Sequence, residues 1–520
     1  MEKKGNAEFT ERRRLAEVYT ESLGEYSLPD YERDVRKILY SSATVHPAGR
    51  FVGNDDIAFS GIIVYNLVYV DPEGRLSSLS FTSDYDYSVK CSPESSLDSY
   101  ASTRVASFAV RLIGPRRVSA RASVVGSVSL LGKRELSVSG DGFSMNEPPV
   151  AEESKINVRS SRFGESEERE YAERLDFLDG ALLDEVEVVY SDAVYLPEGT
   201  TVRDGECEMK GALLMTAVIK NADEPPYHVS KRIPVSEEIK IDGLTEGEAV
   251  IPRVGVSSVK TAINPDETGC EIVMSVIIEA SACAEYNEEA LIVTDAYLTE
   301  CPSLSEYEEF GYTELLSVER ETWGESTTIP KAELESQRPR EVLFVTATPK
   351  TESVKCAAKG VEITGEIKYE GVISETSEEG NVCYLPIKYS APFKRNVNIN
   401  CQNHENLEIE PILRAHSPSA VIDGDNIILE TELEAYMTLL SPRSKRRLSA
   451  LSAKADEPYK ASASVITVYY PTEEDTLFSV AKRFHTTPER IAEDNAVEVM
   501  ASSGVGDSDS LKGVKKLLIY

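Results

Sequence analysis

The sequence predicts a mainly β protein: three repeated β-sandwich or barrel-like domains followed by a small βααβ domain. Three observations predict it. A β-type run that begins with glycine occurs three times, each copy has similar neighbours at similar intervals, and the apolar pattern becomes helical only near the C-terminus.

The repeated run is the clearest feature of the chain. Its copies are Gly61–Val70, Gly211–Lys220 and Gly365–Ile373, and the first ends in the turn residues Asp71-Pro72-Glu73-Gly74. The copies begin 211 − 61 = 150 and 365 − 211 = 154 residues apart. A near-constant period of this kind indicates an internal repeat.

Each copy is flanked by two further β-type runs. The preceding runs are Ile38–Tyr40, Val186–Tyr190 and Val342–Val345. The following runs are Phe81–Val89, Ile233–Val235 and Ala391–Phe393. Short apolar runs joined by turns, with no long helical pattern, are typical of sandwiches and barrels.

The composition along the chain suggests where the domains begin and end. We expect a charged lead-in at residues 1–25, with a short helix over 11–18 as the alternative, and repeats at 26–140, 172–299 and 341–440. The polar segments 141–171 and 300–340 are predicted to be linkers. Residues 441–464 carry 6 − 2 = +4 charges and are predicted to be a basic linker, either a flexible tether or a docking tract for an acidic surface. The last domain is expected at 465–520.

Charge and targeting signals narrow the possible partners. The chain has 55 basic and 89 acidic residues, a net charge of −34, which argues against nucleic acid as a partner and suits docking onto a basic protein surface. The first residues contain no apolar signal region, and no run approaches the roughly 20 apolar residues of a membrane span. The eight cysteines form no Cys-x-x-Cys pair, as expected for thiols in a reducing compartment. We therefore expect a cytoplasmic protein without a transmembrane segment.

The chain lacks the usual motifs of catalysis. It has no phosphate-binding loop, and no two of its five histidines have zinc-ligand spacing. Three β repeats of one type offer no distinct catalytic domain. We therefore expect no enzyme activity, no metal and no cofactor.

The C-terminal region predicts a compact βααβ unit. A strand at 465–470 precedes Asp475, which caps a helix with apolar residues at the spacing i, i+3, i+4, i+7 (Leu477, Val480, Ala481 and Phe484). Pro488 opens a second helix that ends near Asn495, and residues 516–520 form the closing strand.

This unit resembles a LysM domain. Residues 474–484 match the family pattern Gly-Asp-Thr-Leu-Trp-x-Ile-Ala-x-x-aromatic, except that Glu474 replaces the glycine and Phe478 the tryptophan. The loop at 496–511 is also long. LysM domains usually bind N-acetylglucosamine polymers such as peptidoglycan or chitin, so the resemblance implies a partner- or glycan-binding groove. Its candidate residues in this chain are Asp475, Thr476, Leu477, Phe478, Lys482 and Asn495.

The three repeats resemble the SPOCS domain of clostridial spore-coat proteins. The matching residues are Pro29, Asp30, Asp34, Val35, Ile38, Leu39, Gly61, Tyr65, Tyr69 and Val70, echoed at Gly211 and Gly365. Three such domains followed by one LysM domain is the layout of a coat morphogenetic family. The resemblance implies a non-enzymatic scaffold on the mother-cell side of the forespore surface, which binds the coat's basement-layer ATPase.

Two other functions remain open from the sequence. One is a peptidoglycan-binding protein of the cell or spore wall, and the other is a wall hydrolase that carries a LysM domain. Both require export, and the absence of a signal region separates them from a cytoplasmic scaffold.

Overall fold

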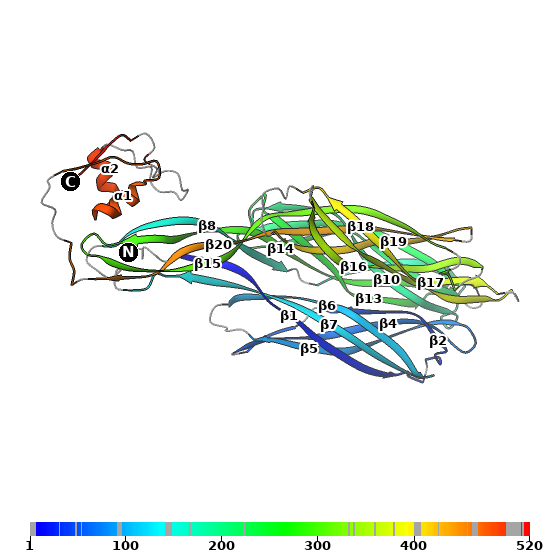
Figure 1. Ribbon diagram of the computed structural model, residues 1–520. Helices are drawn as coiled ribbons and strands as arrows, with labels where there is room; N and C mark the ends of the chain where they lie inside the picture. Colours follow the sequence, from blue (N-terminus) through cyan, green and yellow to red (C-terminus); the bar gives the residue numbers. More distant parts are fainter. Residues whose placement is uncertain are drawn as a thin grey trace.

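Over the residues that the structure describes, the protein is mainly β, with two short helices near the C-terminus (Figure 1). The structure is a computed structural model that describes residues 7–30, 32–46, 49–53, 55–90, 96–140, 148–165, 168–221, 224–330, 333–335, 338–357, 360–377, 380–399, 407–424, 426–454, 456–459, 466–495, 511 and 514–520.

The first two repeats consist of seven strands each over the described residues. The first repeat contains β1 (Ala7–Ser27), β2 (Lys37–Val45), β3 (Gly49–Val52), β4 (Asp56–Val70), β5 (Leu76–Lys90), β6 (Ser96–Gly114) and β7 (Arg117–Leu136). The second contains β8 (Val150–Glu165), β9 (Arg169–Asp179), β10 (Val186–Arg203), β11 (Glu206–Asn221), β12 (Tyr227–Lys240), β13 (Ala249–Pro265) and β14 (Gly269–Tyr297).

The third repeat and the C-terminal module complete the fold. The repeat contains β15 (Ser303–Ile329), β16 (Pro339–Ala357), β17 (Gly360–Thr376), β18 (Val382–Val397), β19 (Glu408–Asp423) and β20 (Asn426–Ala453). The module consists of β21 (Thr467–Tyr469), α1 (Leu477–Phe484), α2 (Pro488–Asn495) and β22 (Leu517–Ile519).

All three repeats have the same topology of two antiparallel sheets. In the first sheet the glycine-led strand lies at the centre, flanked by the strands before and after it: β2-β4-β5, β10-β11-β12 and β16-β17-β18. In the second sheet the last strand of the repeat is central, and it pairs with the strand before it and with the first strand of the repeat. The orders are β1-β7-β6, β8-β14-β13 and β15-β20-β19. In the second repeat β9 also pairs with β14. The β-type runs predicted before and after each glycine-led strand are thus strands of the same sheet.

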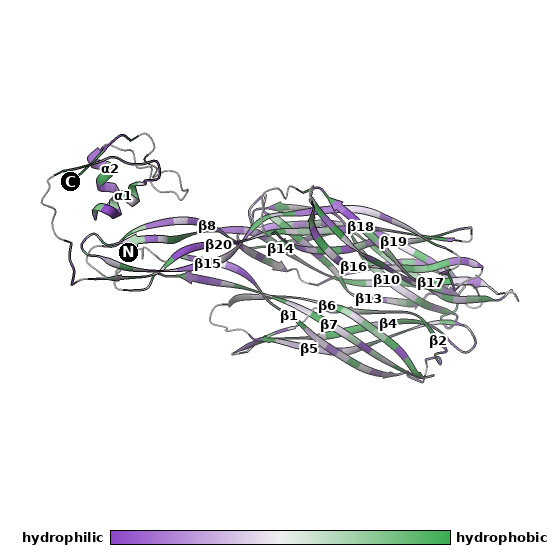
Figure 2. Ribbon diagram, viewed as in Figure 1, coloured by the Kyte–Doolittle hydropathy of each residue, from purple (hydrophilic) through white to green (hydrophobic). Residues whose placement is uncertain are grey.

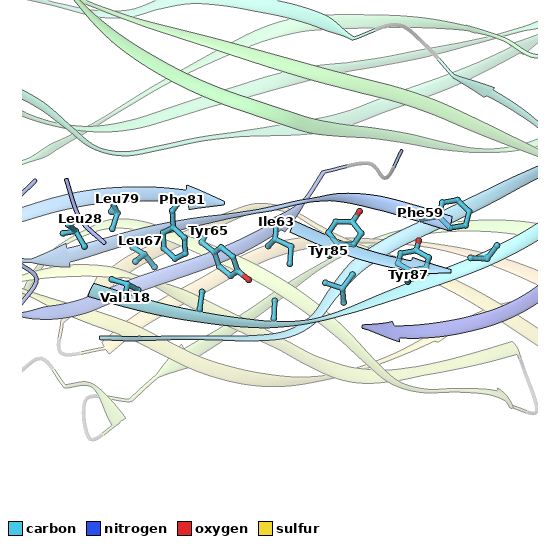
Figure 3. Packing of buried hydrophobic residues seen from close by; sticks show 14 of the residues in the cluster. Leu28, Phe59, Ile63, Tyr65, Leu67, Leu79, Phe81, Tyr85, Tyr87 and Val118 are labelled. Carbon is cyan, nitrogen blue, oxygen red and sulfur yellow. The ribbon is translucent and has the colours of Figure 1, made fainter. Parts of the chain in front are cut away.

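The two sheets of a repeat enclose its core. In the first repeat, Tyr65, Phe81 and Tyr85 of β4 and β5 lie between the sheets with Val118 of β7 (Figure 3). Apolar residues alternate with polar ones along these strands, so that each sheet has an apolar inner face (Figure 2). The second and third repeats have equivalent clusters of their own.

The leading glycines are explained by aromatic rings on neighbouring strands. A Cβ on Gly61 would lie 2.6–2.9 Å from atoms of the Tyr85 side chain, and one on Gly365 would lie 2.8 Å from the Phe393 ring. In the second repeat the ring of Tyr195 lies 2.5 Å from the corresponding position on Gly211. Each strand needs glycine at this point because an aromatic ring occupies the space of a Cβ, joined at Gly211 and Gly365 by the carbonyl oxygens of Leu196 and Lys350.

The repeats are joined by a shared apolar cluster, which we call the axial cluster. Each strand before the glycine-led strand has a bulge at one equivalent residue, Leu39, Val189 or Leu343, which lets consecutive residues face the same way. These residues meet Val68, Val218 and Val372 from the three central strands; the other members are Tyr40, Val70, Leu76 and Phe344.

Three aromatic rings define the symmetry of the axial cluster. The rings of Tyr40, Tyr190 and Phe344 are all in mutual contact, with centroids 5.9, 5.0 and 3.7 Å apart. Their positions differ by 150 and 154 residues, the spacing of the glycines. The repeats are therefore arranged around an approximate threefold axis and are not separate domains on linkers.

The structure contradicts the predicted lead-in and linkers. Residues 7–27 form β1 and pair along β7, so the described part of the lead-in is neither mobile nor helical. Segment 141–171 contains β8 and the start of β9, and 300–340 contains β15, the first strand of the third repeat. The basic linker begins inside β20, which pairs with β15 as far as Ala453. Residues 1–6, 141–147 and 460–464 lie outside the described residues.

These segments resemble linkers in sequence because their strands are polar. Most side chains of β15 are in contact with solvent, and the strand carries Glu306, Glu308 and Glu309. It therefore has fewer apolar residues than β4 or β11. Pairing with β20 nevertheless satisfies its backbone, and Glu308 forms an ion pair with Arg447 directly across the ladder.

Candidate functional site

The C-terminal module contains all six residues predicted to bind a partner or glycan. Leu477 is only 2% exposed and lies in the module's own core with Val480, Ile491 and Leu517. It therefore supports the fold of the module from within.

Thr476 and Asp475 hold the start of α1. The hydroxyl of Thr476 accepts a hydrogen bond from the Ser479 amide at 3.0 Å, while the Ser479 hydroxyl accepts one from the Thr476 amide at 2.9 Å. This is a reciprocal cap. The Asp475 carboxylate accepts hydrogen bonds from the Thr472 amide and hydroxyl and from the Tyr469 hydroxyl. The Thr472 amide is the main cause that holds the pKa of Asp475 below its ordinary value.

Asn495 joins the end of α2 to the closing strand. Its side-chain amide donates to the Ile491 and Leu518 carbonyls at 2.8 and 2.7 Å, and its oxygen accepts from the Leu518 amide at 2.6 Å. These three hydrogen bonds all lie within the module.

Phe478 and Lys482 both contact the second repeat. Phe478 is 5% exposed, and its ring packs edge-on against Tyr297 at the end of β14, with ring centroids 5.3 Å apart. The Lys482 ammonium pairs with the Asp295 carboxylate of the same strand. The structure therefore brings the six predicted residues together but gives each an intramolecular contact; their role in binding stays a prediction.

The exposed apolar surface of the module lies on the far side of its sheet, where the sequence predicted no site. Ile466, Val468, Tyr470 and Tyr520 are 47%, 49%, 70% and 52% exposed, and Val468 pairs with Leu518 across the ladder. We call these five residues the outer face. The sequence signal was the period of two in residues 466–470, where the alternate residue Tyr469 packs against Phe484 of α1.

Polar groups also gather between the repeats. Glu285 of β14 accepts hydrogen bonds from Arg159 at 2.9 Å and from Ser161 at 3.1 Å, and it pairs with Arg12 of the first repeat. Arg159 also reaches Glu410 of the third repeat at 2.8 Å. A buried ion network thus connects all three repeats.

A second buried carboxylate lies within the third repeat. Glu434 of β20 accepts a hydrogen bond from Arg320 at 2.8 Å, lies 3.3 Å from the His416 imidazole and is 3.7 Å from Arg414. Burial alone would raise the pKa of Glu434, but the contacts with His416, Arg320 and Arg414 outweigh it and hold the pKa below its ordinary value of 4.5.

This depressed pKa predicts an acid-dependent stability. As the pH falls, the carboxylate of Glu434 takes up a proton in the unfolded chain before it does so in the folded chain. The contribution of Glu434 to the free energy of unfolding is therefore present above about pH 4.5 and is lost as the pH falls through the folded-state pKa. Glu434→Gln should be less stable than the parent protein at pH 7, and the difference should narrow between pH 5 and 3. Urea unfolding across this range measures it, with Glu430→Gln on the exposed side of β20 as the control. A difference that stays constant with pH would contradict the prediction.

None of these polar clusters has the features of a metal site or substrate pocket. Among the described residues, no group of three or more His, Cys, Asp or Glu side chains is placed to hold a metal ion. A cavity lined by Tyr100, Phe163, Arg253 and Cys283 measures about 10 Å³, which is room for one water molecule. In the part of the chain that the structure describes, no helix is long and apolar enough to cross a membrane.

Comparisons with known proteins add no family. No protein-family model matches the chain, and no curated protein shows significant similarity to it.

Proposed function

We propose that this protein is a non-enzymatic scaffold of spore coat assembly, which docks onto a basement-layer protein of the coat through the outer face of its C-terminal module. The observation that carries the proposal is the exposed apolar surface of Ile466, Val468, Tyr470 and Tyr520, presented by a module that is anchored on an elongated β body (Figure 1). The order of three SPOCS-like repeats and one LysM-like module is that of the coat morphogenetic protein SipL.

The chemistry of the outer face suits a protein partner. Contiguous apolar residues with two tyrosines on a flat sheet are typical of an interaction surface, and tyrosine is enriched among the residues that dominate binding energy. Lys515 and Lys516 are exposed beside β22, so a partner with acidic residues around an apolar patch would fit best. The proposed location is the mother-cell cytoplasm, at the forespore surface.

The arrangement of the body supports a scaffold rather than an enzyme. The buried charged groups around Glu285 are occupied in pairing the repeats with one another. The wall-binding alternative keeps one supporting observation: the exposed rings of Tyr470 and Tyr520 could also stack on sugars.

Substitution of Val468 tests the proposal. Val468→Glu places a charge in the middle of the outer face, and we expect it to weaken binding to the basement-layer ATPase about tenfold or more. Because Val468 is half exposed, the melting temperature of the full chain should stay unchanged. Glu473→Ala, on an exposed turn of the same module, is the matched control.

Two results would argue against the proposal. Unchanged binding by Val468→Glu would show that the outer face is not the docking surface. Micromolar binding of chitin oligomers by the full chain, measured by calorimetry, would favour the wall-binding alternative instead.

A further inference from the structure

The C-terminal module and the segment before it are fixed to the body by several contacts. The segment before it is held on the connection between β14 and β15, where the Lys454 amide donates to the Pro302 carbonyl at 2.8 Å and the Tyr459 amide donates to the Glu300 carbonyl at 2.9 Å. The segment predicted to be a basic linker is therefore, over these residues, attached to the second and third repeats.

The remaining contacts involve α1 and the residues just after it. Tyr297 packs against Phe478, and its hydroxyl donates to the Thr486 carbonyl at 2.6 Å. The ring of Tyr459 stacks on His485, with centroids 3.4 Å apart. His485 is the C-cap of α1 and adopts the left-handed conformation (φ 57°) that ends the helix.

The same contact includes an ion pair whose carboxylate is also held by a residue of the third repeat. Asp295 pairs with Lys482 and also accepts a hydrogen bond from the Tyr307 hydroxyl of β15 at 2.8 Å. The side chains of Lys482 and Asp295 are 39% and 23% exposed, so the pair is partly screened by solvent.

We propose that these contacts form a latch, which covers the α1 face of the module while it leaves the outer face open. A ligand that binds through Phe478 and Lys482 must first displace Tyr297 and Asp295, so the body acts as an intramolecular competitor for this face. The outer face, on the other side of the module, stays accessible in the latched state. The latch does not depend on which partner the outer face binds.

The latch is releasable because the module has a core of its own. Leu477, Val480, Ile491, Leu517 and Ile519 close this core from within the module, and among its fully buried members Tyr297 is the one contributed by the body. The contact thus consists of a few side chains and one partly exposed ion pair, whereas the repeats are joined by the axial cluster and buried ion pairs. Opening the latch should therefore leave both the module and the body folded.

Charge reversal in the full-length chain tests the latch. Lys482→Glu places a carboxylate beside Asp295, and we expect amide hydrogen exchange in 295–302 and in α1 to become about three- to tenfold faster. The double variant Lys482→Glu with Asp295→Lys restores an ion pair of opposite direction and should return exchange towards the parent rate. The double variant keeps glutamate at position 482, so any effect of that charge on the dipole of α1 is the same in both variants. A difference between them therefore reports on the contact with position 295. Arg490→Glu makes the same charge change at an exposed position of α2 and serves as the control.

Two outcomes would overturn the inference. If Lys482→Glu exchanges at the parent rate in both segments, the contact does not hold the module. If exchange rises equally in β21 and β22, the contact is part of the module's fold and not a releasable latch.

Discussion

Val218→Asp is expected to destabilise all three repeats together. Val218 is fully buried in the axial cluster, where it meets Val68 and Val372 from the other two central strands. A carboxylate at this position would be buried among aliphatic and aromatic side chains without a partner. We expect a loss of about 4 kcal/mol or more in the free energy of unfolding.

The pattern of hydrogen exchange distinguishes a shared cluster from three independent domains. In Val218→Asp, exchange should accelerate in β4 and β17 as well as in β11, because all three strands contribute to the axial cluster. Val421→Asp, on an exposed position of β19, should have little effect. Faster exchange confined to the second repeat would contradict the shared arrangement.

Glu285→Ala is also expected to cause a large loss of stability, because it removes the buried carboxylate shared by Arg12 and Arg159 and leaves Arg159 with Glu410 alone. The Glu285 side chain is 1% exposed, and the side chains of Arg159 and Arg12 are 8% and 16% exposed. Removing one partner of a buried ion pair typically costs about 3–5 kcal/mol, since the remaining charge stays buried.

The same strand provides the control. Glu289 pairs with Lys155, but its side chain is 56% exposed, so Glu289→Ala should cost about 1 kcal/mol or less. Chemical unfolding of both variants measures the difference. Equal losses in the two variants would show that the network around Glu285 contributes no more than a surface ion pair.

The sequence predicted the glycine-led strand of each repeat and its neighbours, and it missed the strands that open each repeat. The glycine-led strands and their neighbours were found because both faces of strands such as β4 and β11 are buried, one by the core of the repeat and the other in part by the axial cluster. The turn after β4 was also predicted correctly: the Gly74 amide donates to the Asp71 carbonyl, and Gly74 adopts a positive φ of 83°.

The first strands of the repeats could not be found in the same way. β1 carries Arg12, Arg13 and Arg14 in succession, which is typical of a solvated segment. Arg12 is nevertheless partly buried, because it pairs with Glu285, which comes 273 residues later in the sequence. A single sequence contains no local signal for such a pairing, so the packing of the repeats against one another was not predictable.

The candidate site shows the same limit. The local pattern correctly placed two short helices and a core at Leu477, because helical periodicity depends on nearby residues, but it put the helix cap at Asp475, one residue before the actual N-cap Thr476. The contact that covers Phe478 depends on Tyr297, which is about 180 residues earlier in the chain. The sequence therefore identified the module but not which of its faces is exposed.

The approximate threefold axis relates three copies that belong to one chain, which makes the surface of the body asymmetric. Three identical subunits around such an axis would offer three identical docking positions for a module and would display each surface three times. In this protein the copies belong to one chain, so residues away from the axis differ between the repeats, and the module is attached where Asp295 and Tyr297 end β14. In the described part of the chain the module therefore has one orientation on the body, set by the end of β14.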